Sequence, residues 1–413
     1  MHLLLVKNGL LIDPLLGESR GDLLLADGKI LRKGGRLVPP PGCEVFDAAG
    51  LWVFPGFIDA HVHAREPGAE AAETLESAAF AAAAGGVTSV LLMPNTDPPM
   101  ARPALLRKYA ARVKSLPVNV YFSAAATAGR AGAAPADLAA LKKAGARAFT
   151  DDGSCLPGGA LPELIKKSAA LGLPLLDHPE IFSRTGAGVA APAAASRLGL
   201  PGIPPEAEAY AVLRDILAAA ENGPLHLQHL SLASSLAALR RAKALGWPVT
   251  GETCPHYFAL SERAIKKDDA NFKMKPPLRP EADRRAVLRA LADGTLDLIA
   301  SDHAPHERRL KAKGFAGAPF GITGLETLAP LCVTRLVLAK LISRQRLAQL
   351  LSANPAALLG LRNKGSLRPG RDADLTVIDP RSRRRVTGKF VSKSDNTPFT
   401  GLPLSGWPSA TVV

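Results

Sequence analysis

The sequence predicts an α/β fold: a (β/α)8 TIM-type barrel with a small flanking β-sandwich domain built from both chain ends. Two observations lead to this fold class. From residue 54 onward, short apolar segments rich in Val, Leu and Ile alternate with Ala-rich amphipathic segments, which is typical of repeated βα units and a parallel sheet. Before and after this region, the sequence instead indicates strands separated by hairpin turns.

The flanking domain is predicted first, because it contains the start of the chain. Residues 3–13, 23–35 around Asp27-Gly28, and 44–52 each favour short strands. After Gly365, the segment GSLRPGRDADLTVIDP again indicates short strands and turns. We therefore expect residues 1–53 plus 363–413 to form one composite β domain, and residues 54–362 to form the barrel, a metal-dependent hydrolase domain.

The barrel strands are expected at about eight apolar segments. These are VFPGFIDAH, VTSVLLM, VNVYFSA, ARAFTD, LPLLDH, LHLQH, WPVTGET and LDLIASD, starting at residues 53, 87, 118, 146, 173, 225, 247 and 296. Helices are predicted between them. AETLESAAFAAAAGG should end at Gly85-Gly86, and PEAEAYAVLRDILAAAENG opens with Pro and closes with Gly.

Composition limits the class of protein. With 413 residues, 47% hydrophobic and 21% charged, the chain can bury a large core. No segment favours a signal peptide or a membrane span, so we expect a cytoplasmic protein with no membrane partner.

The four cysteines, at positions 43, 155, 254 and 332, form no C-x-x-C pair, which argues against disulfides and a thiolate zinc site. The net charge of +14 suits an anionic substrate or an acidic partner. Because the basic residues are scattered, we expect no nucleic-acid binding, which stays an alternative only.

The stretch FPGFIDAHVHAREPG, residues 54–68, contains two histidines one residue apart. Strand alternation would place Phe57, Asp59, His61 and His63 on one side of the strand. Two imidazoles on one face are half of a metal site. The alternative interpretation is a hydrogen-bonded core histidine beside a surface histidine, so further ligands must decide.

Further polar residues follow the other predicted strands. In barrels of this kind the active site lies at the carboxyl ends of the strands. The residues found there are His61, His63, Asn95, Asp151, Asp152, His178, His229 and Asp302. Four imidazoles and two carboxylates suit two metals that share a bridging carboxylate and hydroxide. We expect His61 and His63 to bind one metal with Asp302, while His178 and His229 hold the second.

The chain resembles the dihydroorotases of the amidohydrolase superfamily, of the type in which an aspartate bridges the two metals. The resemblance spans nearly the whole chain. The segments that carry it are DAHVHAREPG (59–68), MPNTDPP (93–99), FTDDG (149–153), DHPE (177–180), LQHLS (227–231), SDHAPH (301–306) and PFGITGLET (319–327).

The resemblance implies a role for each matched residue. The metal ligands would be His61, His63, Asp152, His178, His229 and Asp302, with two Zn²⁺ ions bridged by Asp152 and hydroxide. Asp152 is preferred over Asp151 because Ala148 and Thr150, both small, share its face. Asp302 would be the catalytic residue. The substrate would be held by His63, Arg65, Asn95, Lys275 and His306, and by the backbone of Phe320 and Gly321. Lys275 departs from the family, which usually has Asn there.

The activity implied is zinc-dependent, reversible hydrolysis of (S)-dihydroorotate to N-carbamoyl-L-aspartate in de novo pyrimidine (UMP) biosynthesis. A hydantoinase or allantoinase is one rival, but those enzymes bridge their metals with a modified lysine, and ARAFTDDG contains none. The other rival is a non-catalytic dihydroorotase-like subunit that scaffolds aspartate transcarbamoylase, although no metal ligand is lost here. The partner candidates are a second copy of the chain, as a homodimer, and aspartate transcarbamoylase.

Overall fold

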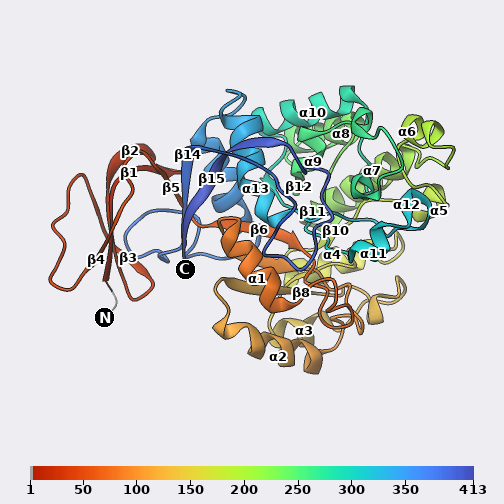
Figure 1. Cartoon of the computed structure of the whole chain (residues 1–413). Coiled ribbons are helices and arrows are strands. Elements are labelled where there is room, and N and C mark those ends of the chain that lie inside the picture. Colours follow the sequence, from red (N-terminus) through yellow and green to blue (C-terminus); the bar gives the residue numbers. More distant parts are fainter. Residues whose placement is uncertain (1–2) are drawn as a thin grey trace.

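The computed structural model describes residues 3–413 and contains a closed barrel of eight parallel strands. Helices surround this barrel (Figure 1). The strands form two four-stranded sheets, in the orders β6-β7-β8-β9 and β10-β11-β12-β13. Parallel bridges from Phe149 to Leu175 and from Val62 to His303 join the two sheets at both seams. The predicted (β/α)8 barrel is therefore confirmed.

Each barrel strand is followed by a helix on the outside of the barrel. The strands are β6 (Phe57–Val62), β7 (Val87–Leu92), β8 (Asn119–Ala124), β9 (Ala146–Phe149), β10 (Leu176–Asp177), β11 (Leu225–Leu227), β12 (Val249–Thr253) and β13 (Leu298–Ile299). The crossover helices are α1 (Leu75–Ala84), α2 (Pro103–Arg112), α3 (Leu138–Lys143), α4 (Leu161–Ala170), α7 (Glu206–Asn222), α8 (Ala233–Ala244), α10 (Glu281–Ala292) and α13 (Leu325–Cys332). Shorter helices are α5 (Phe182–Thr185), α6 (Pro192–Arg197), α9 (Pro255–Ala259), α11 (Arg308–Lys311), α12 (Gly314–Gly317), α14 (Arg344–Ala348) and α15 (Asn354–Leu358).

The two helices predicted in detail end where their sequences indicate. In α1, the Thr74 hydroxyl accepts a hydrogen bond from the Ser77 N–H, and Gly85 follows the last helical residue. Helix α7 starts directly after Pro205 and ends before Gly223, whose φ of 128° is readily adopted only by glycine. Local sequence chemistry is sufficient to set these boundaries.

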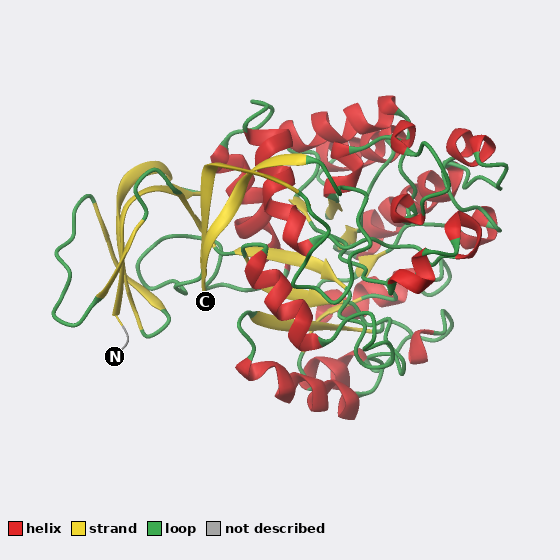
Figure 2. Ribbon diagram, viewed as in Figure 1, coloured by secondary structure: helices red, strands yellow, loops and turns green. Residues whose placement is uncertain are grey.

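Both ends of the chain contribute to a second, seven-stranded sheet beside the barrel, at the left of Figure 2. Its strands are β1 (Leu3–Asp13), β2 (Gly17–Ala26), β3 (Lys29–Gly34), β4 (Glu44–Asp47), β5 (Trp52–Pro55), β14 (Leu375–Arg385) and β15 (Pro403–Val412). The sheet order is β15-β14-β5-β1-β2-β3, and β4 pairs with β1. A bridge from Lys29 to Asp372 brings the β3 edge back to the residues before β14. The predicted flanking β structure is confirmed, and the exact division at residues 53/54 and 362/363 stays a prediction.

The barrel interior is closed with apolar side chains at the end opposite the site. Side chains from four barrel strands meet there, together with α15 and the segment that follows it. The members of this cluster are Ile58, Leu91, Met93, Ala148, Leu176, Ala356, Leu359 and Leu361. The Ser352 hydroxyl, just before α15, donates to the carbonyl of Pro55, just before β6, which fixes α15 at the amino ends of the strands. The candidate site residues gather at the carboxyl ends.

The connection between β14 and β15, residues 386–402, leaves the flanking sheet and reaches the barrel. In Figure 1 this dark blue segment extends from the sheet toward the barrel. The Ser394 hydroxyl donates to the carbonyl of Ala72, and the Thr323 N–H donates to the carbonyl of Asn396. The end of the chain therefore contributes to the side of the barrel where the polar residues gather.

All four cysteines are free thiols, which agrees with the expectation that no disulfide framework exists. None of the helices within residues 3–413 is long and apolar enough to cross a membrane.

Candidate active site

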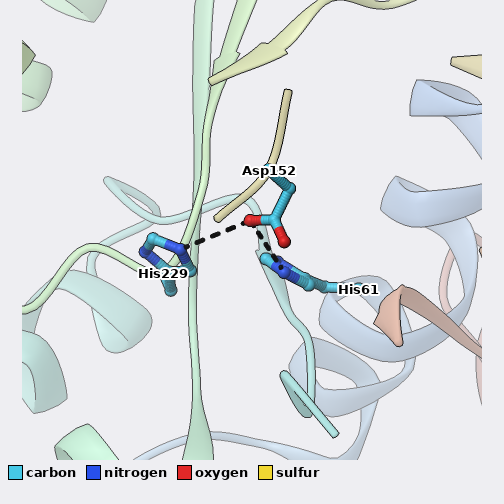
Figure 3. A group of neighbouring side chains, drawn as sticks. All are labelled: His61, Asp152 and His229. Atoms are coloured by element: carbon cyan, nitrogen blue, oxygen red, sulfur yellow. Dashed lines mark ion pairs between the residues drawn. The ribbon is translucent and has the colours of Figure 1, made fainter. Parts of the chain in front are cut away.

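Asp152 lies at the centre of four histidine side chains at the carboxyl ends of the barrel strands. Its Oδ1 atom is 3.3 Å from His61 Nε2, 3.5 Å from His178 Nδ1 and 3.9 Å from His229 Nε2. Its Oδ2 atom is 3.5 Å from His63 Nε2. Figure 3 shows His61 and His229 pointing at this carboxylate from two sides. Residues from the ends of four different strands are thus brought to one point.

Asp302 completes the cluster on the side of the first strand. Its Oδ1 atom is 3.2 Å from His63 Nε2 and 3.5 Å from His61 Nε2. The ligand atoms of His61, His63 and Asp302 lie within 4.8 Å of one another, and so do those of His61, Asp152 and His229. Two overlapping groups of nitrogen and oxygen ligands therefore share His61.

The neighbouring residue Asp151 has a different function. Its Oδ1 accepts hydrogen bonds from the N–H groups of Ala126 and Thr127, and its Oδ2 accepts from the Thr127 hydroxyl. It therefore fastens the loop after β8 and points away from the histidines. Strand alternation correctly separates it from Asp152.

Strand alternation predicted the wrong faces on β6. Ile58 points into the barrel interior and Phe57 packs outside it, the reverse of the prediction. The pairing register shifts between Asp59 and Val62, which brings His61 to the interior. His226, three residues before His229, also points inward, with its Nε2 atom 3.3 Å from Glu252 Oε2.

Unusual backbone conformations explain how two of the cluster residues turn inward after their strands end. His229 has a φ of 35° and Asp302 a φ of 48°, in the left-handed region that non-glycine residues rarely adopt. Such strain persists where the surrounding structure enforces it, and it is frequent at functional sites. At His229 and Asp302, the direction of the side chain therefore outweighs the local preference of the backbone.

Hydrogen bonds on the outer side of the histidines fix which nitrogen faces the cluster. His61 Nδ1 lies 2.8 Å from Glu252 Oε1, and His63 Nδ1 lies 2.8 Å from Asn95 Oδ1. Because a carboxylate or amide oxygen only accepts, each Nδ1 carries the hydrogen and each Nε2 presents its lone pair inward. The His61 Nε2 atom is buried and has no hydrogen-bond partner among the described residues.

The electrostatics of the cluster suit a cation. Burial alone would raise the pKa of Asp152, but the nearby His61 and a hydrogen bond with His178 lower it well below its usual 3.8. Burial, with His178 and His61 close by, lowers the pKa of His229 to about 3, so this imidazole is neutral. Burial would also lower the pKa of His61 and His178, but Asp152 and Asp302 raise that of His61 well above its usual 6.5, and Asp152 and Glu180 raise that of His178 to about 9. Zn²⁺ binds neutral imidazoles and carboxylates, so a bound ion would replace the protons that these two histidines otherwise hold. The donor set therefore fits a metal centre.

A cavity of about 250 Å³ opens above the cluster. It is lined by His63, Arg65, Asn95, Asp152, Gly153, His178, Phe182, His229, Lys275, Asp302, Ala304, His306, Phe320 and Gly321. All the residues expected to hold a substrate are in this wall. His61 lies deeper and does not line the cavity.

The cavity wall away from the cluster is cationic. Desolvation lowers the pKa of Arg65 to about 10, which leaves its guanidinium charged at neutral pH. Its Nε–H donates to the carbonyl of Pro305 at 3.1 Å. His306 Nε2 donates to the carbonyl of Phe320 at 2.7 Å, and burial beside Arg65 lowers the pKa of His306 to about 3. His306 is therefore a neutral group at the side of a fixed positive charge.

Lys275 occupies the same wall, close to His178. Its Nζ atom is 3.3 Å from Glu180 Oε2 and 3.9 Å from the centre of the Phe182 ring. Glu180 Oε2 in turn lies 3.2 Å from His178 Nε2. Lys275 thus connects the cavity to the carboxylate that orients His178.

Sequence reasoning missed the carboxylates behind the histidines. Glu252 and Glu180, both buried, hold the outer nitrogens of His61 and His178. Glu252 lies within the strand segment WPVTGET, where a charged residue in a buried strand is itself a signal. Its partner could not be identified, because His61 is 191 residues away in the chain.

A closed barrel with a histidine and carboxylate cluster at the carboxyl ends of its strands defines a metal-dependent hydrolase of the amidohydrolase type. Family comparisons agree. A model described as dihydro-orotase-like matches residues 50–235, and the amidohydrolase family model matches residues 206–413. A dihydroorotase of Pelotomaculum thermopropionicum is 43% identical, covering 99% of this chain and 97% of that protein. One from Carboxydothermus hydrogenoformans is 41% identical, covering 99% and 96%.

Solved structures with this fold include an L-hydantoinase (dihydropyrimidinase) from Arthrobacter aurescens. It superposes with a TM-score of 0.90 at 26% identity, covering 100% of this chain and 95% of that one. A D-hydantoinase (dihydropyrimidinase) from Thermus sp. gives a TM-score of 0.80 at 27% identity, covering 99% and 94%. Identity to the dihydroorotases is much higher over a similar length. The chain belongs to the dihydroorotase family of the amidohydrolases, and the resemblance seen in the sequence is confirmed.

Proposed function

We propose that the protein catalyses the reversible hydrolysis of the cyclic amide of (S)-dihydroorotate to N-carbamoyl-L-aspartate, a step of de novo pyrimidine biosynthesis. One observation carries the proposal. A single cavity has the histidine and carboxylate cluster on one side and the charged guanidinium of Arg65 on another. Dihydroorotate has a ring amide to be cleaved and a carboxylate to be held, and the cavity offers a partner to each.

The metal set we propose is two Zn²⁺ ions, with Asp152 as the shared ligand. His61, His63 and Asp302 would hold one ion, and His178 and His229 the other. The position of Asp152, within 3.9 Å of histidine nitrogens from both sets, supports this division. When bound, such a pair of ions activates a water molecule at neutral pH and polarises the amide carbonyl.

The substrate would be held by its carboxylate. The guanidinium of Arg65 can bind it through two parallel hydrogen bonds, and Asn95 and His306 are close enough to add further ones. His63 and Lys275 complete the wall, and the backbone of Phe320 and Gly321 covers the ring. His306 is neutral, since its pKa is about 3, and its one ring hydrogen lies on Nε2, so it would reach the substrate carboxylate by turning this N–H away from the Phe320 carbonyl.

Asp302 would move the proton. It lies on the cavity wall and also contacts His63, so it can face both the attacking water and the leaving nitrogen. As the water attacks the carbonyl carbon, the Asp302 carboxylate accepts its proton and passes it to the ring nitrogen as the C–N bond breaks. In the reverse direction the same carboxylate returns the proton while the ring closes.

A second candidate function is hydantoinase or allantoinase activity, which the structural neighbours favour by fold alone. The position between the two histidine sets is occupied here by Asp152, where those enzymes carry a modified lysine. The full histidine and carboxylate set likewise argues against a non-catalytic scaffolding subunit. Association with aspartate transcarbamoylase, a homodimer and a cytoplasmic location remain part of the proposal.

The experiment that tests the function combines metal analysis with substrate comparison. We expect the purified protein to contain up to two zinc ions and to hydrolyse dihydroorotate faster than hydantoin or allantoin. Removing the metal with a chelator should abolish turnover, and zinc should restore it. Full activity in a metal-free sample, or a preference for uncharged hydantoin, would contradict the proposal.

A further inference from the structure

Asn396 joins the C-terminal connection to two loops of the substrate cavity. Its Oδ1 atom accepts a hydrogen bond from the backbone N–H of His306 at 3.0 Å. Its Nδ2 group donates to the carbonyl of Gly321 at 3.0 Å and to that of Ala304 at 3.2 Å. A side-chain amide has one oxygen acceptor and two N–H donors, so this pattern fixes its orientation. The side chain uses every kind of hydrogen bond that it can make.

The three residues that Asn396 holds line the substrate cavity, whereas Asn396 does not. It is 1% exposed and lies behind the two loops. These loops touch closely: a Cβ atom on Gly321, which has a φ of 128°, would lie 2.6 Å from the Ala304 Cβ. The relative position of the two loops therefore depends on contacts of this kind, and small shifts would move the cavity wall.

The segment that carries Asn396 is itself anchored to the barrel. The hydroxyl of Ser392 bonds to buried Glu73, and the hydroxyl of Ser394 donates to the carbonyl of Ala72 at 2.7 Å. Lys311 Nζ donates to the carbonyl of Gly321 at 2.9 Å, the same carbonyl that Asn396 binds. The Gly321 carbonyl thus has two supports, whereas within residues 3–413 the only side chain that accepts from the His306 N–H is Asn396.

We propose that Asn396 is a positioning residue for substrate binding, acting through His306 and Gly321 without touching the substrate. The inference rests on the proposed function, because it assigns His306 to the substrate carboxylate. A side chain more than 300 residues after the first metal-ligand candidate, His61, would then set the shape of the carboxylate-binding wall. The effect is expected mainly in KM, since these contacts hold the ground state as well as the transition state.

Two substitutions of Asn396 remove different sets of its hydrogen bonds. Asn396→Ala removes all three, and Asn396→Asp keeps the size and the acceptor for His306 but turns a carboxylate oxygen toward two carbonyls. We expect each to raise KM for dihydroorotate about tenfold, with kcat changed by less than about threefold and metal content unchanged. Ser394→Ala is the matched control, because it removes the bond to Ala72 that anchors the same segment but none of the hydrogen bonds to the cavity loops. Its KM should rise far less than that of either Asn396 variant.

Two further measurements show whether Asn396 acts through His306. Adding Asn396→Ala to His306→Ala should raise KM by less than about twofold over His306→Ala alone, because the two changes remove one shared effect. Hydrogen exchange of the unliganded protein should be faster in residues 303–307 and 319–324 of the Asn396 variants than in Ser394→Ala. This second readout needs no substrate, so it is independent of the proposed function, which the wild-type activity tests separately.

The proposal would be overturned by folded Asn396 variants with wild-type KM and wild-type exchange in these loops. It would also be overturned by fully additive effects of Asn396→Ala and His306→Ala. If neither Asn396 variant folds while Ser394→Ala does, the side chain is required for the fold as a whole and a specific positioning role is wrong.

Discussion

The carboxylate of Glu252 holds the Nδ1 atom of His61 at 2.8 Å, and its second oxygen lies 3.3 Å from His226 Nε2. All three groups are at most 1% exposed. His61 and His226 donate on either side of the carboxylate, and together they lower the pKa of Glu252 to about 2 despite its burial. Glu252 therefore stays charged and keeps the lone pair of His61 Nε2 directed at the cluster.

This relationship predicts that Glu252 determines metal affinity. Glu252→Ala should weaken zinc binding by about 10- to 100-fold, the range typical of residues that orient a metal ligand. Glu252→Gln should have a smaller effect, because its amide oxygen can still accept from His61. Competition with a chromophoric chelator measures both. Equal zinc affinity in wild type and Glu252→Ala would contradict the prediction.

Loss of a proposed metal ligand should be more severe. In His61→Ala or His178→Ala we expect at least one metal ion to be lost and activity to fall by about 10²-fold or more, since no other group replaces the missing lone pair. Elemental analysis and dihydroorotate hydrolysis measure the two effects. Zinc added after chelation should restore the wild type but not the variants, and variants with full metal content would show that the ligand set is assigned incorrectly.

Arg65 should determine the preference for a charged substrate. Arg65→Met removes the positive charge that we assign to the substrate carboxylate, so KM for dihydroorotate should rise by about 10- to 100-fold. Arg65→Lys should retain part of the affinity because it keeps the charge but not the paired geometry. Any turnover of hydantoin, which lacks the carboxylate, should be little affected. An equal loss for both substrates would mean that Arg65 acts on the structure of the site.

Lys311 should make stability depend on pH. Burial, with Lys273 nearby, lowers the pKa of Lys311 from 10.5 to about 7. Between these two values the unfolded chain binds a proton that the folded protein does not, so stability should rise as pH increases from about 7 toward 10.5. The contribution is at most about 1.4 kcal/mol per pH unit.

Urea unfolding of wild type and Lys311→Met at several pH values between 7 and 10 measures this dependence. The variant has no titrating group at this position, so its free energy of unfolding should rise less steeply with pH. If the two curves are parallel, the Lys311 amine stays charged in the folded protein.

The parts of the structure that could be predicted are those governed by local sequence. The eight strand segments follow from their apolar runs, and the ends of α1 and α7 follow from Gly85, Pro205 and Gly223. The choice of Asp152 over Asp151 follows from strand alternation, which holds at β9. In each case the information lies within a few residues of the feature.

What could not be predicted depends on contacts between distant residues or on departures from regular backbone. A register shift on β6 and left-handed φ values at His229 and Asp302 turn side chains inward against strict alternation. Asn396 carries no signal in the sequence, and the signal at Glu252, a charge within a buried strand, does not identify its partner. Their partners, 191 residues away for Glu252 and 90 residues away for the His306 N–H, become evident only when the barrel is closed.

Asp302 should be required for proton transfer. Burial alone would raise the pKa of Asp302, but His61 and a hydrogen bond with His63 lower it below its usual 3.8, so the side chain is a carboxylate at neutral pH. Asp302→Asn keeps the size and one oxygen that can reach a metal, but an amide cannot accept a proton at neutral pH. Because proton transfer of this kind contributes about 10²- to 10⁴-fold, kcat should fall by at least the lower factor while much of the metal stays bound.

Wild-type kcat should decline at acidic pH, and this acidic limb of the pH profile reports the coupled titration of Asp302 and the attacking water. Measurements of kcat at several pH values, with metal analysis of the same samples, test these effects. A variant with near-normal kcat and the same acidic limb would assign the proton transfer to another residue, and His306 would be the next to test.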